Sequence, residues 1–234
     1  EIGRNVEELI VERNGDRVTV KVKVPRKSSR GIESDLYIQV PEASSVDVGT
    51  VSADIEVEGV LGEQRLEAVS GDIDTVAGKA DIAAGTVSGD VTIKGEGKDA
   101  ETRAASVSGD LSLYRLAGNV EAESGSGDLI VDEGSVDRAG FSGVNGDIIF
   151  NSELRRGGTL SVEAVNGEVD LQFAGDVSAQ FDIDTFNGDI DNCFGPEPKR
   201  TSKYAPGMAL SFSEGNGDGR VTVSTVNGDI TICK

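Results

Sequence analysis

The residues of this sequence that could do chemistry are carboxylates that recur at nearly constant intervals. Each is the fourth residue of a five-residue phrase of the form Val-Ser/Asn-Gly-Asp-Ile, which occurs in nine copies. Successive acids lie 18 to 21 residues apart, except for a step of 40 before the last. The nine acidic positions are Asp54, Asp72, Asp90, Asp110, Asp128, Asp147, Glu168, Asp189 and Asp229. A repeat of this kind decides the fold before any single residue does.

A column of carboxylates on neighbouring repeats could share calcium ions, because Ca²⁺ prefers oxygen ligands. The candidate ligands are Asp72, Asp90, Asp110, Asp128 and Asp147. The calcium-binding β-roll, however, carries an acid every nine residues in a Gly-Gly-x-Gly-x-Asp pattern, whereas this chain has one acid per repeat. We therefore predict that the carboxylates bond to turn backbone and that no metal is bound.

Catalysis is hard to place on these residues. The chain has no His, no Ser with an evident base and no phosphate-binding loop. The pairs Asp182/Asp184 and Asp189/Asp191 alternate along a strand and resemble a glycosidase pair, but among 42 acids such pairs arise by composition. The sequence therefore predicts no catalytic residue and no cofactor.

A second candidate site is a basic and aromatic segment in the long step before the last phrase. In so acidic a chain, these residues could bind an anionic sugar or an acidic loop of a protein partner. They are Lys199, Arg200, Lys203 and Tyr204. The alternative, which we favour, is a lid whose apolar side chains cover the open end or flank of the last repeat. Those side chains are Phe194, Met208, Leu210 and Phe212.

The elements that position these residues are short strands. Each repeat holds two runs of alternating apolar residues separated by Gly-bearing turns, and no stretch shows helical periodicity. The pattern predicts an all-β fold, a parallel β-solenoid of about nine coils over 49–234. The crossover rule for parallel strands favours right-handed coiling.

The second and third positions of the phrase support stacking of the coils. The second position is Ser in five copies and Asn in the last four, and stacked amides can form a ladder of hydrogen bonds. These residues are Asn145, Asn166, Asn187 and Asn227. The third position is Gly in every copy except the first, where Ala53 stands, and we expect Gly to supply a positive φ at the corner.

The first 48 residues lack the phrase and are predicted to form an antiparallel cap on one continuous domain. Residues 6–13 and 17–24 alternate in polarity and are joined by Asn14-Gly15-Asp16, a strong hairpin signal. A third strand is expected at 35–40. A solenoid needs such a cap because its first coil would otherwise expose an unpaired edge.

The two cysteines bear on the long step. Cys193 and Cys233 each lie four residues after the acid of their phrase, so they occupy equivalent positions. On adjacent coils their Cα atoms would be about 5 Å apart, within reach of a disulfide, whereas a hidden coil between them would double that distance. We favour adjacent coils, a disulfide, and an excursion over 194–219.

Charge and hydropathy exclude several classes of partner. The formal net charge of -20 repels nucleic acid and anionic membrane surfaces, and the apolar runs are too short to span a membrane. The chain begins at Glu1, from which we expect that a leader was removed or left out.

The repeated phrase, Asp35-Leu-Tyr-Ile-Gln-Val-Pro41, and the ending from Tyr204-Ala-Pro-Gly to Cys233 together resemble a family of bacterial exported repeat proteins described as adhesin-like. The resemblance covers almost the whole chain. It implies a β-solenoid in the periplasm or on the cell surface, and it supplies no catalytic or binding residues.

We therefore expect a non-enzymatic cell-envelope scaffold, monomeric, whose rod presents a surface for protein or glycan contact. One alternative is a polysaccharide-active β-helix enzyme, although such enzymes usually carry several long loops and this chain has one. Another is a periplasmic partner of an envelope signalling system.

Overall fold

A computed structural model describes residues 8–23, 35–202 and 206–234, and this part of the chain contains strands and no helix. The chain divides into two compact units, Glu1–Val40 and Pro41–Lys234. Among the described residues no helix is long and apolar enough to cross a membrane.

The first unit contains a β-hairpin. Strands β1 (Glu8–Asn14) and β2 (Arg17–Lys23) pair antiparallel, and Gly15 turns the chain with a φ of 64°. This confirms the predicted hairpin, while the rest of the proposed cap at 1–7 and 24–34 lies outside the described residues. The strand expected at 35–40 is not formed, because no described strand lies beside it to complete a ladder. The hairpin's role as a cap stays a prediction.

The second unit is a parallel β-solenoid, which confirms the predicted fold class. One series of strands precedes the phrase of each coil and consists of β3 (Val46–Thr50), β5 (Gln64–Ser70), β7 (Ile82–Ser88), β9 (Asp99–Ser108), β11 (Ala117–Ser126), β15 (Ala179–Asn187) and β19 (Gly219–Asn227). The other series follows the phrase and consists of β4 (Ile55–Val57), β6 (Ile73–Ala77), β8 (Val91–Gly95), β10 (Leu111–Tyr114), β14 (Val169–Phe173), β16 (Ile190–Asn192) and β20 (Ile230–Cys233). Strands β12 (Leu129–Asn145) and β13 (Ile148–Asn166) each run from one phrase to the next. The predicted boundary at 48/49 falls inside β3.

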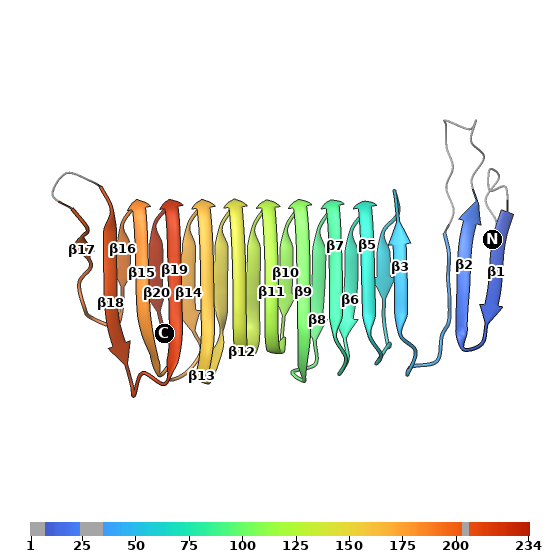
Figure 1. Ribbon diagram of the computed structural model, residues 1–234, viewed down its shortest axis with the longest axis horizontal. Helices are drawn as coiled ribbons and strands as arrows, with labels where there is room; N and C mark the ends of the chain where they lie inside the picture. The colour runs from blue at the N-terminus through green and yellow to red at the C-terminus, as the bar shows by residue number, and fades with distance from the viewer. Residues whose placement is uncertain (1–7, 24–34, 203–205) are drawn as a thin grey trace. The chain divides into compact units, whose positions relative to one another are not determined.

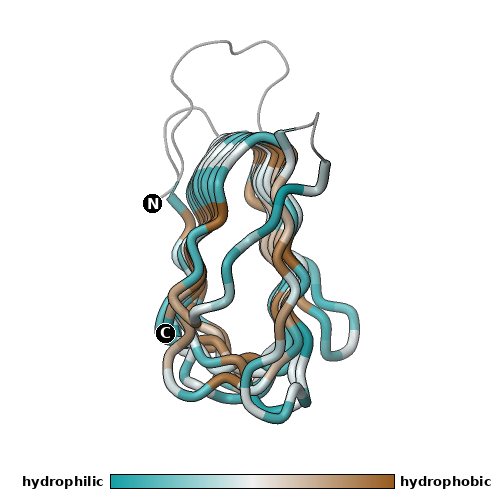
Figure 2. The backbone as a smooth tube through the Cα atoms, turned by 90° about the vertical axis from the view of Figure 1, so that its left-hand side faces the viewer, coloured by the Kyte–Doolittle hydropathy of each residue, from teal (hydrophilic) through white to brown (hydrophobic). Residues whose placement is uncertain are grey.

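The coils close around a narrow apolar core. Side chains alternate inward and outward along each strand, and the last residue of the phrase always points inward. Ile73, Val91 and Leu111 are fully buried in this column and stack directly on one another in the parallel register. Viewed along the solenoid, successive coils superimpose, so each residue column runs along the length of the unit (Figure 2).

The coil order departs from the chain order at the C-terminal end. The unit has about seven turns in all, slightly fewer than the nine coils expected. The last two coils along the chain exchange places in the stack. Strand β19 pairs parallel with β13 on one side and with β15 on the other, and β20 lies in the same way between β14 and β16. In Figure 1 the red β19 stands between the yellow-orange β13 and the orange β15.

The excursion forms a lid on the outermost coil. Strand β18 (Met208–Glu214) pairs antiparallel with β15, and the short β17 (Lys199–Arg200) pairs with β18. Phe212 stacks on Phe181 of β15 with ring centroids 4.5 Å apart, and Leu210 is buried. The antiparallel strand therefore ends the parallel ladder and covers its apolar core, as the lid interpretation predicts.

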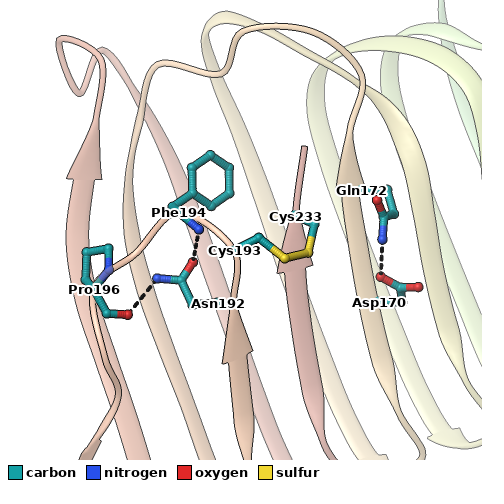
Figure 3. The surroundings of a disulfide bond; sticks show 7 residues. All are labelled: Asp170, Gln172, Asn192, Cys193, Phe194, Pro196 and Cys233. Atoms are coloured by element: carbon teal, nitrogen blue, oxygen red, sulfur yellow. Dashed lines mark hydrogen bonds between the residues drawn. A yellow bond between two sulfur atoms is a disulfide. The ribbon is translucent and has the colours of Figure 1, made fainter.

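A disulfide joins Cys193, just after β16, to Cys233 of β20, with the Cα atoms 4.9 Å apart (Figure 3). Because β16 and β20 are directly paired, there is no hidden coil between them. Beside the disulfide, the Asn192 side chain accepts a bond from the N–H of Phe194 and donates to the Pro196 carbonyl. These bonds hold the start of the excursion against the coil.

Candidate functional site

The acids of the phrase form a ladder of side chain to backbone hydrogen bonds. The N–H of Asp72 donates to Oδ1 of Asp54 at 3.0 Å, and the N–H of Asp90 donates to Oδ1 of Asp72 at 2.9 Å. The same bond recurs up the column through Asp110, Asp128, Asp147 and Glu168, and from Asp189 to Asp229. Seven of the nine carboxylates thus satisfy a corner N–H of the next coil, which is the turn chemistry that the sequence predicts.

Glu168 interrupts the acid ladder. Its own N–H donates to Asp147, but among the described residues no bond runs from the N–H of Asp229 to the Glu168 carboxylate. Asp229 belongs to the coil inserted next to Glu168. The longer Glu side chain does not take the position that Asp takes in the other coils, so the ladder is broken where the chain order is broken.

The Gly column allows the coils to approach closely at the corner. The φ values of these glycines are positive, such as 153° at Gly109 and 134° at Gly146. A Cβ added at Gly109 would lie 1.9 Å from the carbonyl oxygen of Gly89. Ala53 is tolerated because it lies in the first coil of the unit, where no earlier coil places a carbonyl against it.

The four Asn side chains form the predicted amide ladder, in the order of the coils. Nδ2 of Asn166 donates to Oδ1 of Asn145 at 3.0 Å, and Nδ2 of Asn227 donates to Oδ1 of Asn166 at 2.9 Å. Asn187 then donates to Asn227 at 2.9 Å. The Asn side chains of the phrase therefore hold neighbouring coils together.

The phrase acids have no cationic partner in the part of the chain that the structure describes. The ion pairs there lie elsewhere, for example between Arg155 and Asp137 at 2.9 Å and between Arg103 and Glu121 at 3.0 Å. The hydrogen bond from Arg155 to Asp99 raises the pKa of the guanidinium above its ordinary value. No group of three metal-ligating side chains occurs among the described residues, and the Asp72 to Asp147 column presents backbone-bonded carboxylates instead.

The residues proposed for partner binding are only partly described. Lys199 and Arg200 form β17 on the lid, and both are exposed. Lys203 and Tyr204 lie outside the described residues. The structure therefore brings two of the four basic and aromatic residues together on the lid.

The acid pairs that resemble a glycosidase site are held by neighbouring side chains. Asp184 accepts a hydrogen bond from the Ser224 hydroxyl at 2.9 Å, and Asp182 lies 3.7 Å from the guanidinium of Arg220. Asp189 and Asp191 are exposed on the corner and on β16. All four lie on exposed positions of one flat coil, and no hollow that the structure describes gathers them.

A hollow of about 420 Å³ lies beside the lid, between the turns of the last coils. Its charged residues pair with each other or with close neighbours: Arg156 lies 2.9 Å from Asp218, and Lys234 lies 3.8 Å from Glu214. The Ser178 hydroxyl accepts from the N–H of Asn216 and donates to Asp218. The Asp218 carboxylate oxygen that accepts from Ser178 is the one that Arg156 contacts.

An exposed column of apolar side chains, which we name the valine ridge, was not predicted from the sequence. It is the first position of the phrase and stacks in register beside the Ser/Asn column. Its members are Val51, Val69, Val87, Val107, Val144, Val165, Val226 and Phe186, each at least 40% exposed. The signal was available, because the preceding residue points inward and strand alternation turns the first position outward.

Comparison with known proteins gives one family. A family model described as Toastrack DUF4097 matches residues 4–121 and again residues 116–233. The two matches overlap at the start of β11, where the solenoid is continuous because β11 pairs with both β9 and β12. Among curated proteins and solved structures, none matches the chain.

Proposed function

The chain belongs to the Toastrack DUF4097 family, a repeat β-solenoid domain of unknown function, and on this basis we propose that it is a non-enzymatic interaction scaffold. The observation that carries the proposal is that the recurring positions of the phrase make contacts between coils. Its acids, glycines and asparagines bond or pack one coil against the next. The side chains that remain for function are those exposed on the strand faces and on the lid, in a fixed array with a step of about 4.8 Å per coil.

We place the protein in the cell envelope, in the periplasm or on the cell surface. The Cys193–Cys233 disulfide supports this location, because disulfides persist in oxidising compartments. Thiol labelling of protein purified without reductant tests the placement. Two unreactive cysteines are expected, and two labelled thiols would contradict it.

The lid offers a contact for an anionic glycan or an acidic protein loop, since Lys199 and Arg200 are exposed in an otherwise acidic chain. The test is binding of purified polygalacturonate, an anionic polysaccharide, with neutral dextran as the comparison. The variant Lys199→Glu with Arg200→Glu should bind about tenfold more weakly, the combined worth of two exposed charge contacts. Lys79→Glu with Lys94→Glu changes the net charge equally and should leave binding unaltered.

The same samples test the enzymatic alternative. Reducing ends are measured after long incubation of the wild-type chain with each polysaccharide, and none should be released. Steady release that scales with protein concentration would overturn the scaffold proposal in favour of a polysaccharide-active enzyme. Equal weakening in the lid and control variants would overturn the lid contact alone.

A further inference from the structure

The valine ridge is an apolar surface that the fold leaves uncovered. Seven valines and Phe186 follow the coils, interrupted only at Gly125, and Val87 remains 46% exposed although it stacks between Val69 and Val107. Over the nine phrases, which are separated by eight steps of about 4.8 Å, the ridge is on the order of 38 Å long. Single exposed apolar residues are ordinary on a protein surface, whereas a contiguous apolar stripe marks an interaction site.

A column of carboxylates runs parallel to this ridge on one side, and scattered carboxylates lie on the other. On the corner side lies the acid ladder, whose members sit three residues after each ridge residue and have no cationic partner among the described residues. On the sheet side, two residues before the ridge, exposed acids occur in four coils as Glu67, Glu123, Glu163 and Asp184, and Glu67 is paired with Arg65. Adjacent carboxylates about 4.8 Å apart repel by about 0.9 kcal/mol in water.

We propose that the valine ridge and its flanking acids form a docking surface for an extended, basic polypeptide segment that alternates Lys or Arg with apolar side chains. The apolar residues of such a segment cover the valines. Its cations neutralise the carboxylates of the acid ladder, which have no cationic partner among the described residues. A second copy of this chain is the poorer occupant, because apposing two ridges would bring two acid ladders together in a molecule of net charge -20.

The backbone bonds of the acid ladder leave charge available for a partner. In Asp72, Asp90 and Asp110, Oδ1 accepts the N–H of the next coil, so the second carboxylate oxygen is free of that bond. An Asn at the same position would keep an acceptor oxygen for the backbone while removing the charge. Charge and ladder can therefore be separated by substitution.

The experiment measures binding of a labelled Lys-Val alternating peptide of about 12 residues, long enough to span on the order of 40 Å when extended. Two comparison peptides of equal length alternate Lys with Ser and Glu with Val. The protein is the full chain. We expect the Lys-Val peptide to bind more tightly than both others, and to bind less tightly as salt is added.

Two sets of variants locate the surface. Val69→Thr, Val87→Thr and Val107→Thr keep β-branched residues on the ridge, and Asp72→Asn, Asp90→Asn and Asp110→Asn keep the ladder acceptors. Each triple variant should weaken the Lys-Val peptide about tenfold, as expected for three lost contacts of this kind.

Matched controls lie elsewhere. Val11→Thr with Val18→Thr removes valines of similar exposure on the hairpin, and Glu56→Gln, Asp74→Asn and Asp191→Asn removes three charges from the strands after the phrase. Circular dichroism verifies that each variant is folded, and both controls should bind as wild type.

Three results would overturn the inference. The first is equal binding of the Lys-Ser peptide, which would reduce the surface to its charge. The second is an unchanged affinity in the ridge or acid variants. The third is a wild-type dimer, seen by sedimentation, that the ridge variant abolishes, which would make the ridge a self-interface. The inference rests on the proposed scaffold role but not on Lys199 and Arg200, so it can fail while the lid contact stands.

Discussion

At the scale of single residues, the Gly, Asp and Asn positions of the phrase each make a different contact between stacked coils. Gly lets a carbonyl of the neighbouring coil come closer than any Cβ allows, Asp satisfies the next corner N–H, and Asn bonds to its own equivalent. An unpaired N–H or C=O at these corners would cost free energy wherever water cannot reach it. The regularity of the phrase is therefore explained by coil-to-coil contacts.

The break at Glu168 gives the first prediction. Glu168→Asp should extend the acid ladder to the N–H of Asp229 and raise the free energy of unfolding by about 1 kcal/mol, the usual net worth of one such bond. Urea titration followed by circular dichroism measures the change. The control Glu163→Asp shortens an exposed Glu outside the phrase, and an equal gain in both variants would contradict the explanation.

The Gly column gives the second prediction. Gly109→Ala should lower the free energy of unfolding by about 3 kcal/mol or more, because the new Cβ meets the Gly89 carbonyl in addition to the strained φ. Gly97 also has a positive φ, of 70°, but nothing lies within 4 Å of its added Cβ. Gly97→Ala should therefore cost only about 1 kcal/mol. Similar losses in the two variants, measured by urea titration, would show that coil contact is not the cause.

Much of the contact pattern within the phrase could be predicted from the sequence, because identical residues at constant spacing show which residues of neighbouring coils stack on one another. The Asn ladder and the positive φ of the glycines follow from that register alone. The valine ridge was missed for a physical reason: an apolar residue in an alternating strand is first interpreted as core. Only the inward-pointing residues on both sides of Val87, Thr86 before it and Val91 beyond the corner, show that it faces out.

At the scale of elements, the lid and the inserted coil close the C-terminal end together. The lid strand β18 covers β15, and β19 fills the space between β15 and β13. Aromatic rings follow the same path, from Phe150 through Phe173 and Phe181 to Phe212. The wide aromatic side chains thus gather where the coils are out of chain order.

The lid gives the third prediction. Phe212→Ala should lower the free energy of unfolding by about 2 kcal/mol, since the ring stacked on Phe181 is lost from a partly buried site. Thermal unfolding measures the loss, and light scattering should report association through the uncovered end of the ladder. Ser211→Ala, which changes the exposed neighbour on β18, is the control. An unaltered midpoint in Phe212→Ala would mean that the lid does not close the core.

The disulfide gives the fourth prediction. Replacing both Cys193 and Cys233 by Ser opens a loop with a sequence separation of 40 residues. The lost restriction of the unfolded chain should lower the free energy of unfolding by about 4 kcal/mol. The double variant should unfold at lower urea than the oxidised wild type and at the same urea as the reduced wild type. If reduction leaves the wild-type midpoint unchanged, the bond is not formed in solution or does not constrain the unfolded chain.

The insertion of β19 and β20 could not be predicted from the sequence. The phrases that end at Ile190 and Ile230 fit the same columns, so either coil can occupy either slot without altering the register. Adjacency of Cys193 and Cys233 holds in both orders. The order of the last two coils depends on the lid. Strand β18 pairs with β15, so the coil that contains β15 must be the outermost one.

At the scale of the whole solenoid unit, the two family matches merge into one continuous ladder. Strand β11 begins inside the overlap of the two matches and pairs with both β9 and β12, so the second match continues the stack begun by the first. Most contacts are between neighbouring coils, as in other solenoids, and a local substitution should act mainly on its two neighbours. The proposed binding surfaces, the lid and the valine ridge, depend on this unbroken stacking.

The coil order is tested most directly by engineered disulfides in a chain that carries Cys193→Ser and Cys233→Ser. Ser161 of β13, Thr222 of β19 and Asp182 of β15 share one outward column, with Thr222 in the middle. Neighbours in this column are about 4.8 Å apart and can be bridged, whereas Ser161 and Asp182 are about twice as far apart and cannot. Intact mass after oxidation should therefore show a bond for Ser161→Cys with Thr222→Cys and none for Ser161→Cys with Asp182→Cys. The opposite result would restore the chain order and contradict the insertion of the last coil.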